Sequence, residues 1–391
     1  MGAEPDLTND DQRRVSALEL FFDLVFVFAI TRTTELLGED ATATGLLRGL
    51  VVLAVVWWAW DGYAWLTNEV DTERDAVRLS IFAAMAAMLI VALAIPGAFG
   101  ADATLFAAAY ASVRLVHVVL YTQASGDDGG RLAVRRLMPS IAVACALLFG
   151  AAAVDGTAQT LLWVAAVAAD YLGLLVTGTK GWRVQASHFA ERHSLIVLIA
   201  LGESVVDIGA GVRDEALGAG VVTAALLAAT AIAAMWWAYF DVVAPVAERR
   251  MRAAAPEDRV ALARDSYTFL HLPMVAGIVL LAAGIKQAIG HVGDPLETVP
   301  AIELCGGPAL YLVAHILFRL RNVHSLNRQR IVAAVALVAL IPVSTSASAL
   351  TALTLVAAIL TGLITYEALR FREARARIRA GGGSVRFSPP S

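Results

Sequence analysis

Apolar runs separated by short polar stretches recur along the whole chain. Each run is roughly 20 residues long, the length that an α-helix needs to cross the hydrocarbon core of a bilayer, so the pattern predicts an all-α integral membrane protein of about twelve transmembrane helices. The predicted spans lie near residues 17–37, 46–66, 78–96, 103–122, 134–153, 158–177, 190–211, 218–241, 263–286, 301–319, 329–347 and 350–370. The weakest boundary separates the last two spans, where Pro342 and the Ser/Thr-rich residues 343–348 interrupt the apolar pattern.

Composition supports this interpretation. Hydrophobic residues make up 59% of the 391 residues and charged residues only 16%, and the mean hydropathy is +0.69. Because a soluble domain carries roughly 25% charged residues, this chain lacks the polar surface to cover itself in water. Cys145 and Cys305 both fall within apolar runs, without the spacing of a disulfide framework or a metal site, and are expected to be packing residues.

The basic residues indicate the orientation. With the N-terminus in the cytoplasm, most of the 30 lysines and arginines fall in cytoplasmic segments, while Arg48, Arg213 and Lys286 lie outside and Arg32 and Arg114 lie within spans. Cytoplasmic retention of Lys and Arg sets orientation, so both ends of the chain are predicted in the cytoplasm. The N-terminus lacks the features of a signal peptide, and the predicted location is the bacterial plasma (inner) membrane.

The two halves of the chain resemble each other. Residues 57–61 (WWAWD) are similar to residues 236–241 (WWAYFD), and His117 and His315 each follow a tyrosine in corresponding spans. This predicts two parallel six-helix repeats. The predicted domains are a cytoplasmic N-terminal segment at 1–16, repeats at 17–182 and 183–371, and a disordered, basic cytoplasmic tail at 372–391. Such repeats favour a functional site between the halves, although a duplication without functional consequence is the alternative.

Charged residues interrupt the first and seventh spans at matching places. Each span has a charged inner end, seven apolar residues and an acidic outer half. A charge near the bilayer centre costs on the order of 3 kcal/mol, so these two helices are expected to be sheltered together inside the bundle. The candidate residues of an ion or substrate pathway are Glu19, Asp23, Arg32, Glu35, Asp61, Arg114, His117, Glu191, Arg192, His193, Glu203, Ser204 and Asp207.

Two interpretations of these charges remain open. The acids bind a cation or relay protons, or Arg32, Arg114 and Arg192 neutralise them in structural ion pairs. We expect no metal, because His188 and His193 are five residues apart and do not share a helix face, unlike the pair in HExxH. No phosphate-binding or dinucleotide motif is present, so no cofactor is expected. The basic tail suits anionic headgroups better than nucleic acid, so no nucleic-acid partner is expected.

Residues 19–30 (ELFFDLVFVFAI) and 188–206 (HFAERHSLIVLIALGESVV) resemble the bacterial low temperature requirement protein A family, over roughly residues 11–375. The resemblance implies a membrane protein linked to growth in the cold, and it brings no catalytic residues with it. Our leading hypothesis is a transporter or channel-like protein for an ion or small solute. The alternatives are a membrane-embedded enzyme that acts on a lipid-borne substrate with Glu203 or His193 as acid or base, or a non-catalytic stress or assembly factor. The expected partners are the lipid bilayer and an ion or small solute, and a homo-oligomer is left open.

Overall fold

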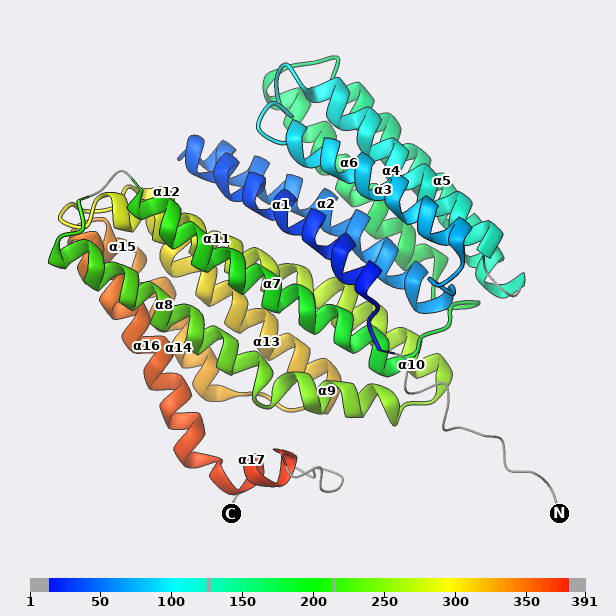
Figure 1. The fold of residues 1–391 in the computed structure, drawn as a ribbon. Coiled ribbons are helices and arrows are strands. Elements are labelled where there is room, and N and C mark those ends of the chain that lie inside the picture. Colours follow the sequence, from blue (N-terminus) through cyan, green and yellow to red (C-terminus); the bar gives the residue numbers. More distant parts are fainter. Residues whose placement is uncertain (1–13, 125–127, 214–215, 380–391) are drawn as a thin grey trace.

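The computed structural model describes residues 14–124, 128–213 and 216–379. Within these residues the regular structure is helical, apart from one isolated bridge between Pro295 and Ser348. Long helices run side by side, with the earlier helices forming one group and the later helices another (Figure 1). This architecture is the expected solution for an apolar chain in a bilayer, because helices satisfy every backbone hydrogen bond within one segment.

Six helices form the first group. They are α1 (Ala17–Glu39), α2 (Ala43–Glu69), α3 (Asp75–Ala94), α4 (Ala103–Ala124), α5 (Asp128–Ala151) and α6 (Gly156–Thr177). Helix α1 packs on α2 and α3. Helix α3 packs on α4, α4 on α5 and α5 on α6, while α2 also contacts α4 and α6.

The second group is more irregular. Its elements are α7 (Ala186–Val212), α8 (Ala219–Phe240), α9 (Val243–Arg252), α10 (Pro256–Leu262), the π-helix η1 (Ala263–Phe269), α11 (Leu270–Gly290), α12 (Thr298–Ala301), the π-helix η2 (Ile302–Gly306), α13 (Gly307–Val323), α14 (Arg328–Ala339), α15 (Ile341–Ser344), α16 (Ala349–Arg370) and α17 (Arg372–Arg379). Helix α7 packs on α8 and α11. Helix α11 contacts α13, α13 contacts α14, and α14 contacts α16.

Ten helices among the described residues are long and apolar enough to cross a membrane, which confirms a multi-pass membrane protein. The remaining two predicted spans coincide with α1, which carries four charged residues between Glu19 and Glu35, and with α14 and α15, which are separated at Leu340. Pro342 explains this break, because proline has no N–H to continue a helix. The count of twelve stays a prediction.

The two groups meet along four helices. Helix α1 contacts α7 and α11, and α2 contacts the same two helices. In Figure 1 the blue α1 accordingly lies next to the green α7 and the yellow-green α11. Any residue buried between these four helices therefore touches both halves of the molecule.

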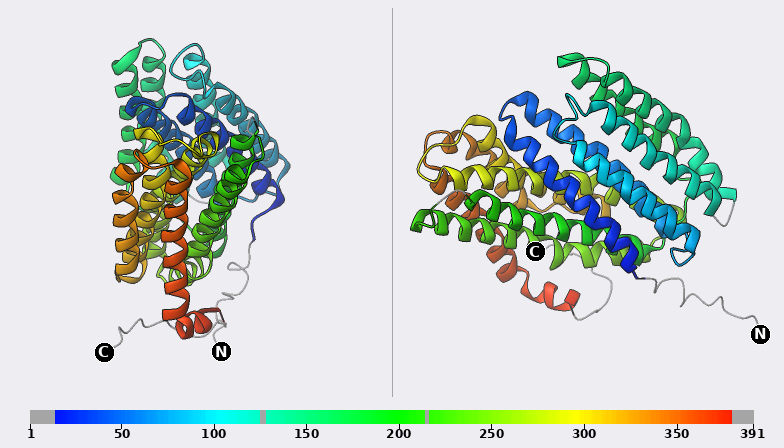
Figure 2. Two further views of the ribbon diagram at one scale, coloured as in Figure 1. Left: turned by 90° about the vertical axis from the view of Figure 1, so that its left-hand side faces the viewer. Right: turned by 45° about the horizontal axis from the view of Figure 1, so that its top comes forward.

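The basic tail is partly ordered, contrary to the expectation of disorder. Residues 372–379 form α17, which runs across the end of α16 (Figure 2). Arg375 explains the order, since its Nε lies 2.6 Å from Asp241 Oδ2 and its guanidinium lies 5.5 Å from the Trp237 ring centroid. Residues 380–391 of the tail, like residues 1–13 of the N-terminal segment, lie outside the described part of the chain.

Glycines let α11 approach its neighbours at backbone distance. A Cβ added at Gly277 would lie 2.6 Å from the carbonyl oxygen of Gly307, and one added at Gly284 would lie 2.4 Å from the backbone nitrogen of Leu304. Small residues allow close helix packing in membranes, where van der Waals contact replaces the hydrophobic driving force. These two positions therefore fix the distance of α11 from η2 and α13.

We predict that Gly284→Ala destabilises the protein by about 1–3 kcal/mol, because backbone atoms cannot move aside as a flexible side chain can. Thermal unfolding in detergent, followed by size-exclusion chromatography, measures the effect. Gly362→Ala in α16 is the matched control, because its added Cβ would meet nothing within 4 Å. Equal melting temperatures for the two variants would contradict the packing account.

Candidate functional site

Arg192 of α7 lies at the centre of a buried ionic cluster between the halves. Its side chain is fully buried. Nη2 donates to Asp23 Oδ1 at 2.5 Å, and Nη1 donates to Glu19 Oε1 at 3.3 Å and to Thr67 Oγ1 at 2.9 Å. Since Glu19 and Asp23 belong to α1 and Thr67 to α2, one guanidinium ties two helices of the first half to the second half.

The local sequence positions Glu19 for two tasks. Ser16 caps α1, and Glu19 completes a capping box by accepting from the Ser16 backbone N–H at 2.8 Å. The other carboxylate oxygen of Glu19 faces Arg192 and lies 2.9 Å from Nε2 of His188. Nδ1 of His188 lies 3.1 Å from the amide nitrogen of Asn68 in α2. The start of α1 is therefore held in place by α7 and α2.

Asp23 is the most enclosed acid of this cluster. Its Oδ1 also accepts from Nε1 of Trp60 at 2.8 Å, and Oδ2 has no hydrogen-bond partner among the described residues. The guanidinium carbon of Arg192 lies 5.8 Å from the Trp60 ring centroid. Two carboxylates thus face one guanidinium in a site without exposure, where charges interact more strongly than in water.

A second polar group adjoins this cluster around Asp61 of α2. Asp61 Oδ1 accepts from Thr268 Oγ1 at 2.9 Å and lies 3.3 Å from Nε2 of His193. The rings of His193 and His271 are 5.2 Å apart, and the Tyr239 hydroxyl lies 2.8 Å from Nε2 of His271. Buried polar side chains therefore continue from α2 across α7 into the second half.

Thr268 reaches Asp61 from a π-helical segment. Pro273 in α11 has no N–H to donate to the backbone one turn earlier, and the turns before it are the π-helix η1. Such π-helical turns are frequent at functional sites. Thr268 also accepts from Nε1 of Trp65 at 2.9 Å, so η1 is bound to α2 through two hydrogen bonds at one side chain.

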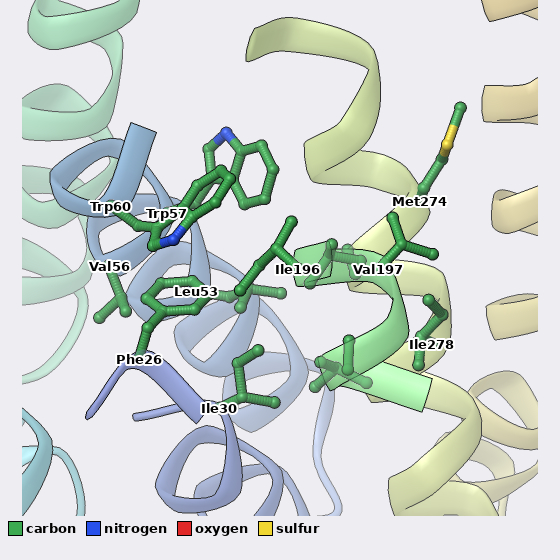
Figure 3. Packing of buried hydrophobic residues seen from close by; sticks show 14 of the residues in the cluster. Phe26, Ile30, Leu53, Val56, Trp57, Trp60, Ile196, Val197, Met274 and Ile278 are labelled. Atoms are coloured by element: carbon green, nitrogen blue, oxygen red, sulfur yellow. The ribbon is translucent and has the colours of Figure 1, made fainter. Parts of the chain in front are cut away.

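An apolar layer lies next to these groups at the boundary between the halves (Figure 3). It is formed by buried side chains from all four helices at the boundary. These are Phe26 and Ile30 of α1, Leu53 and Val56 of α2, Ile196 and Val197 of α7, and Met274 and Ile278 of α11. Part of each apolar stretch between the charged ends of α1 and of α7 thus meets in one layer.

Beyond the apolar layer, toward the C-terminal ends of α1 and α7, lies a second acidic group. Thr31 of α1 donates to Glu203 of α7, and Asp207, which is 4% exposed, has no hydrogen-bond partner at Oδ2 among the described residues. Arg32 and Glu35 form the expected ion pair and are both partly exposed. Charged residues are therefore buried between α1 and α7 at two levels along the helices.

The remaining candidates lie apart from these two groups. Arg114 pairs with Asp170 at 3.3 Å within the first half, where His117 is buried as well. Glu191 accepts from the backbone N–H of Val15 at 3.2 Å, and the Ser204 hydroxyl donates to the carbonyl of Ala200 at 3.1 Å. No group of three or more metal-ligating side chains occurs among the described residues.

Sequence reasoning left several partners out of its list of candidates. They are Trp60, Thr67, His188, Tyr239, Thr268 and His271. The similarity of residues 57–61 to residues 236–241 contained a signal for two of them, since Trp60 and Tyr239 occupy matching positions and both bond to buried polar groups. Thr268 had no such signal, because its contact depends on the π-helical turns.

These observations define a multi-pass helical membrane protein that buries charged side chains between two groups of helices. The sequence pattern described as "Bacterial low temperature requirement A protein (LtrA)" matches residues 14–365, so the chain belongs to this family and the expected resemblance is confirmed. It is also similar to "Uncharacterized protein RA0937" of Rhizobium meliloti (strain 1021), with 28% identity over 316 residues that cover 78% of this chain and 76% of the relative. No solved structure matches the chain.

We predict that Arg192→Gln destabilises the protein by about 3–5 kcal/mol, because two buried carboxylates lose their charged partner. Unfolding by a denaturing detergent, followed by circular dichroism, measures the loss. Arg32→Gln is the matched control: its ion pair with Glu35 is partly exposed and is worth at most about 1 kcal/mol. Similar losses in the two variants would show that the buried cluster is not a special contributor to stability.

Proposed function

We propose that this protein is a transporter or channel-like protein for an ion or small solute in the bacterial plasma membrane. The route runs between α1 and α2 of the first half and α7 and α11 of the second. One observation carries the proposal: charged residues from both halves are buried at this boundary at two depths. Ionisable residues inside a membrane are costly, and they typically mark ion or substrate pathways.

The proposed topology has twelve spans with both ends in the cytoplasm. Helix α1 is 23 residues long and so extends about 35 Å, which is enough to cross the hydrocarbon core. Helices α14 and α15 together form the broken eleventh span. The distribution of basic residues supports the orientation, because it puts most of them in cytoplasmic segments.

The proposed organisation is two parallel six-helix repeats at residues 17–182 and 183–371. The order of helix contacts supports it: the first helix of each half packs on the second and third, and the third to sixth follow one another. In this correspondence α1 matches α7, α2 matches α8 and α3 matches α11. A route between two such repeats is common among transporters.

The apolar layer closes this route in the present conformation. Hydrophobic constrictions exclude water and ions and can act as gates. Transport therefore requires α1 and α2 to shift against α7 and α11. The ion pairs of Arg192 lie on one side of the apolar layer and Glu203 and Asp207 on the other, so polar groups flank the closure on both sides.

We predict that the purified protein in proteoliposomes carries at least one of three probes faster than empty liposomes: rubidium, sodium or protons detected by an internal pH dye. Asp23→Asn and Glu203→Gln are expected to lower this flux about tenfold, equivalent to about 1.4 kcal/mol, because each removes a charge that faces the route. Flux is normalised to folded protein.

Glu367→Gln is the control for a purely structural ion pair. Glu367 of α16 pairs with Arg330 of α14 at 2.9 Å within the second half, away from the proposed route. This variant should lose stability and keep its flux per folded molecule. Unchanged flux in both route variants, or no flux of any probe by the unmodified protein, would contradict the proposal.

A further inference from the structure

A small chamber lies inside the first half, next to the boundary. Its volume is about 40 Å³, where a single water needs roughly 10–15 Å³, so it has room for a solute of a few heavy atoms. Its walls include the indole side chains of Trp58, Trp65 and Trp182 and the polar side chains of Asp61, Arg114 and His117. These six residues come from α2, α4 and the connection between α6 and α7.

Two side chains of this chamber carry an N–H group without a partner. Nε1 of Trp182 and Nε of Arg114 make no hydrogen bond to any described residue. Both side chains are more than nine-tenths buried. Because buried N–H groups in proteins nearly always find an acceptor, two free donors in the lining of one chamber favour a bound acceptor.

The carboxylate of Asp61, in contrast, requires a ligand group that is cationic or donates hydrogen bonds. It also lines the chamber, and its described partners at Oδ1 are Thr268 and His193. An anion alone would be repelled by this carboxylate, and a cation alone would leave the free N–H groups of Trp182 and Arg114 without an acceptor. Arg114 is already ion-paired with Asp170, so a ligand that carries both a cationic group and an acceptor would match the Asp61 carboxylate and the free N–H groups together.

We propose that the chamber binds a small zwitterion, in which a primary ammonium and a carboxylate are separated by one carbon. The ammonium faces the Asp61 carboxylate and the indole rings, which attract cations through their faces. The carboxylate accepts from the free N–H groups of Arg114 and Trp182 through charge-assisted hydrogen bonds. Arg114 keeps its contact with Asp170 through Nη2, so its Nε remains available.

Asp61 connects this chamber to the proposed route. Its side chain lines the chamber and accepts from Thr268 of η1 in the second half. The inference deepens the proposed function, and it rests on that function only where it makes the zwitterion a transported solute. Binding itself can be measured without any transport.

Equilibrium binding of radioactive glycine to the full chain in detergent tests the inference. We expect saturable binding that glycine displaces at least tenfold more effectively than methylammonium or acetate, each of which carries one of the two charges. Asp61→Asn is expected to abolish binding. Because Asp61 also accepts from Thr268, Trp182→Phe is the second variant, and it should weaken binding several-fold through loss of one N–H donor.

His315→Gln is the matched control, since it changes a buried histidine of the second half, outside the chamber, and should leave glycine binding unchanged. No glycine binding, as expected for a chamber that holds water only, would overturn the inference. Equal competition by methylammonium or by acetate would overturn the zwitterion, and unchanged binding in Trp182→Phe would overturn the location. Glycine binding without flux of glycine or of any ion probe would overturn the proposed function alone, whereas ion flux without glycine binding would overturn this inference alone.

Discussion

The fold depends on neutralising one guanidinium in a medium that cannot hydrate it. Arg192 is fully buried, so its charge must be balanced by protein groups, and Glu19, Asp23 and Thr67 supply the partners from two helices of the other half. Taking a charge out of water is costly, and only close opposite charges with further hydrogen bonds offset that cost. The boundary between the halves is therefore specified by charge in addition to shape, because sliding α7 by one turn would separate Arg192 from both acids.

The same boundary combines features that favour order with features that favour movement. Polar groups lie on both sides of a layer made only of apolar side chains, such as Phe26, Ile196 and Ile278 (Figure 3). Apolar contacts between helices gain little from the hydrophobic effect in a bilayer, since lipid tails offer a similar environment. In the proposed transport, the ionic cluster is the pivot about which α1 and α2 move against α7 and α11 while the apolar layer parts. This division of roles links the buried charges to the proposed transport.

Much of the fold was predictable from the sequence, because the bilayer imposes a length and a composition on every spanning helix. Hydropathy predicted the ten spans and the burial of Asp23 and Glu203 inside the bundle. Helical spacing predicted the pairing of Arg32 with Glu35. The partners across helices did not follow, since helical spacing predicts only neighbours on the same helix. The contact of Thr268 with Asp61 depends on π-helical turns, and the order of α17 depends on Arg375 reaching Asp241.

The central claim is that Asp23 and Arg192 bind each other across the boundary between the halves. A double-mutant cycle with Asp23→Asn, Arg192→Gln and the combined variant, measured by unfolding in mixed micelles, isolates their interaction from the effects of each substitution alone. The account predicts a coupling free energy of about 1–3 kcal/mol, with the double variant losing less stability than the sum of the single variants. Additive losses, with a coupling near zero, would contradict it.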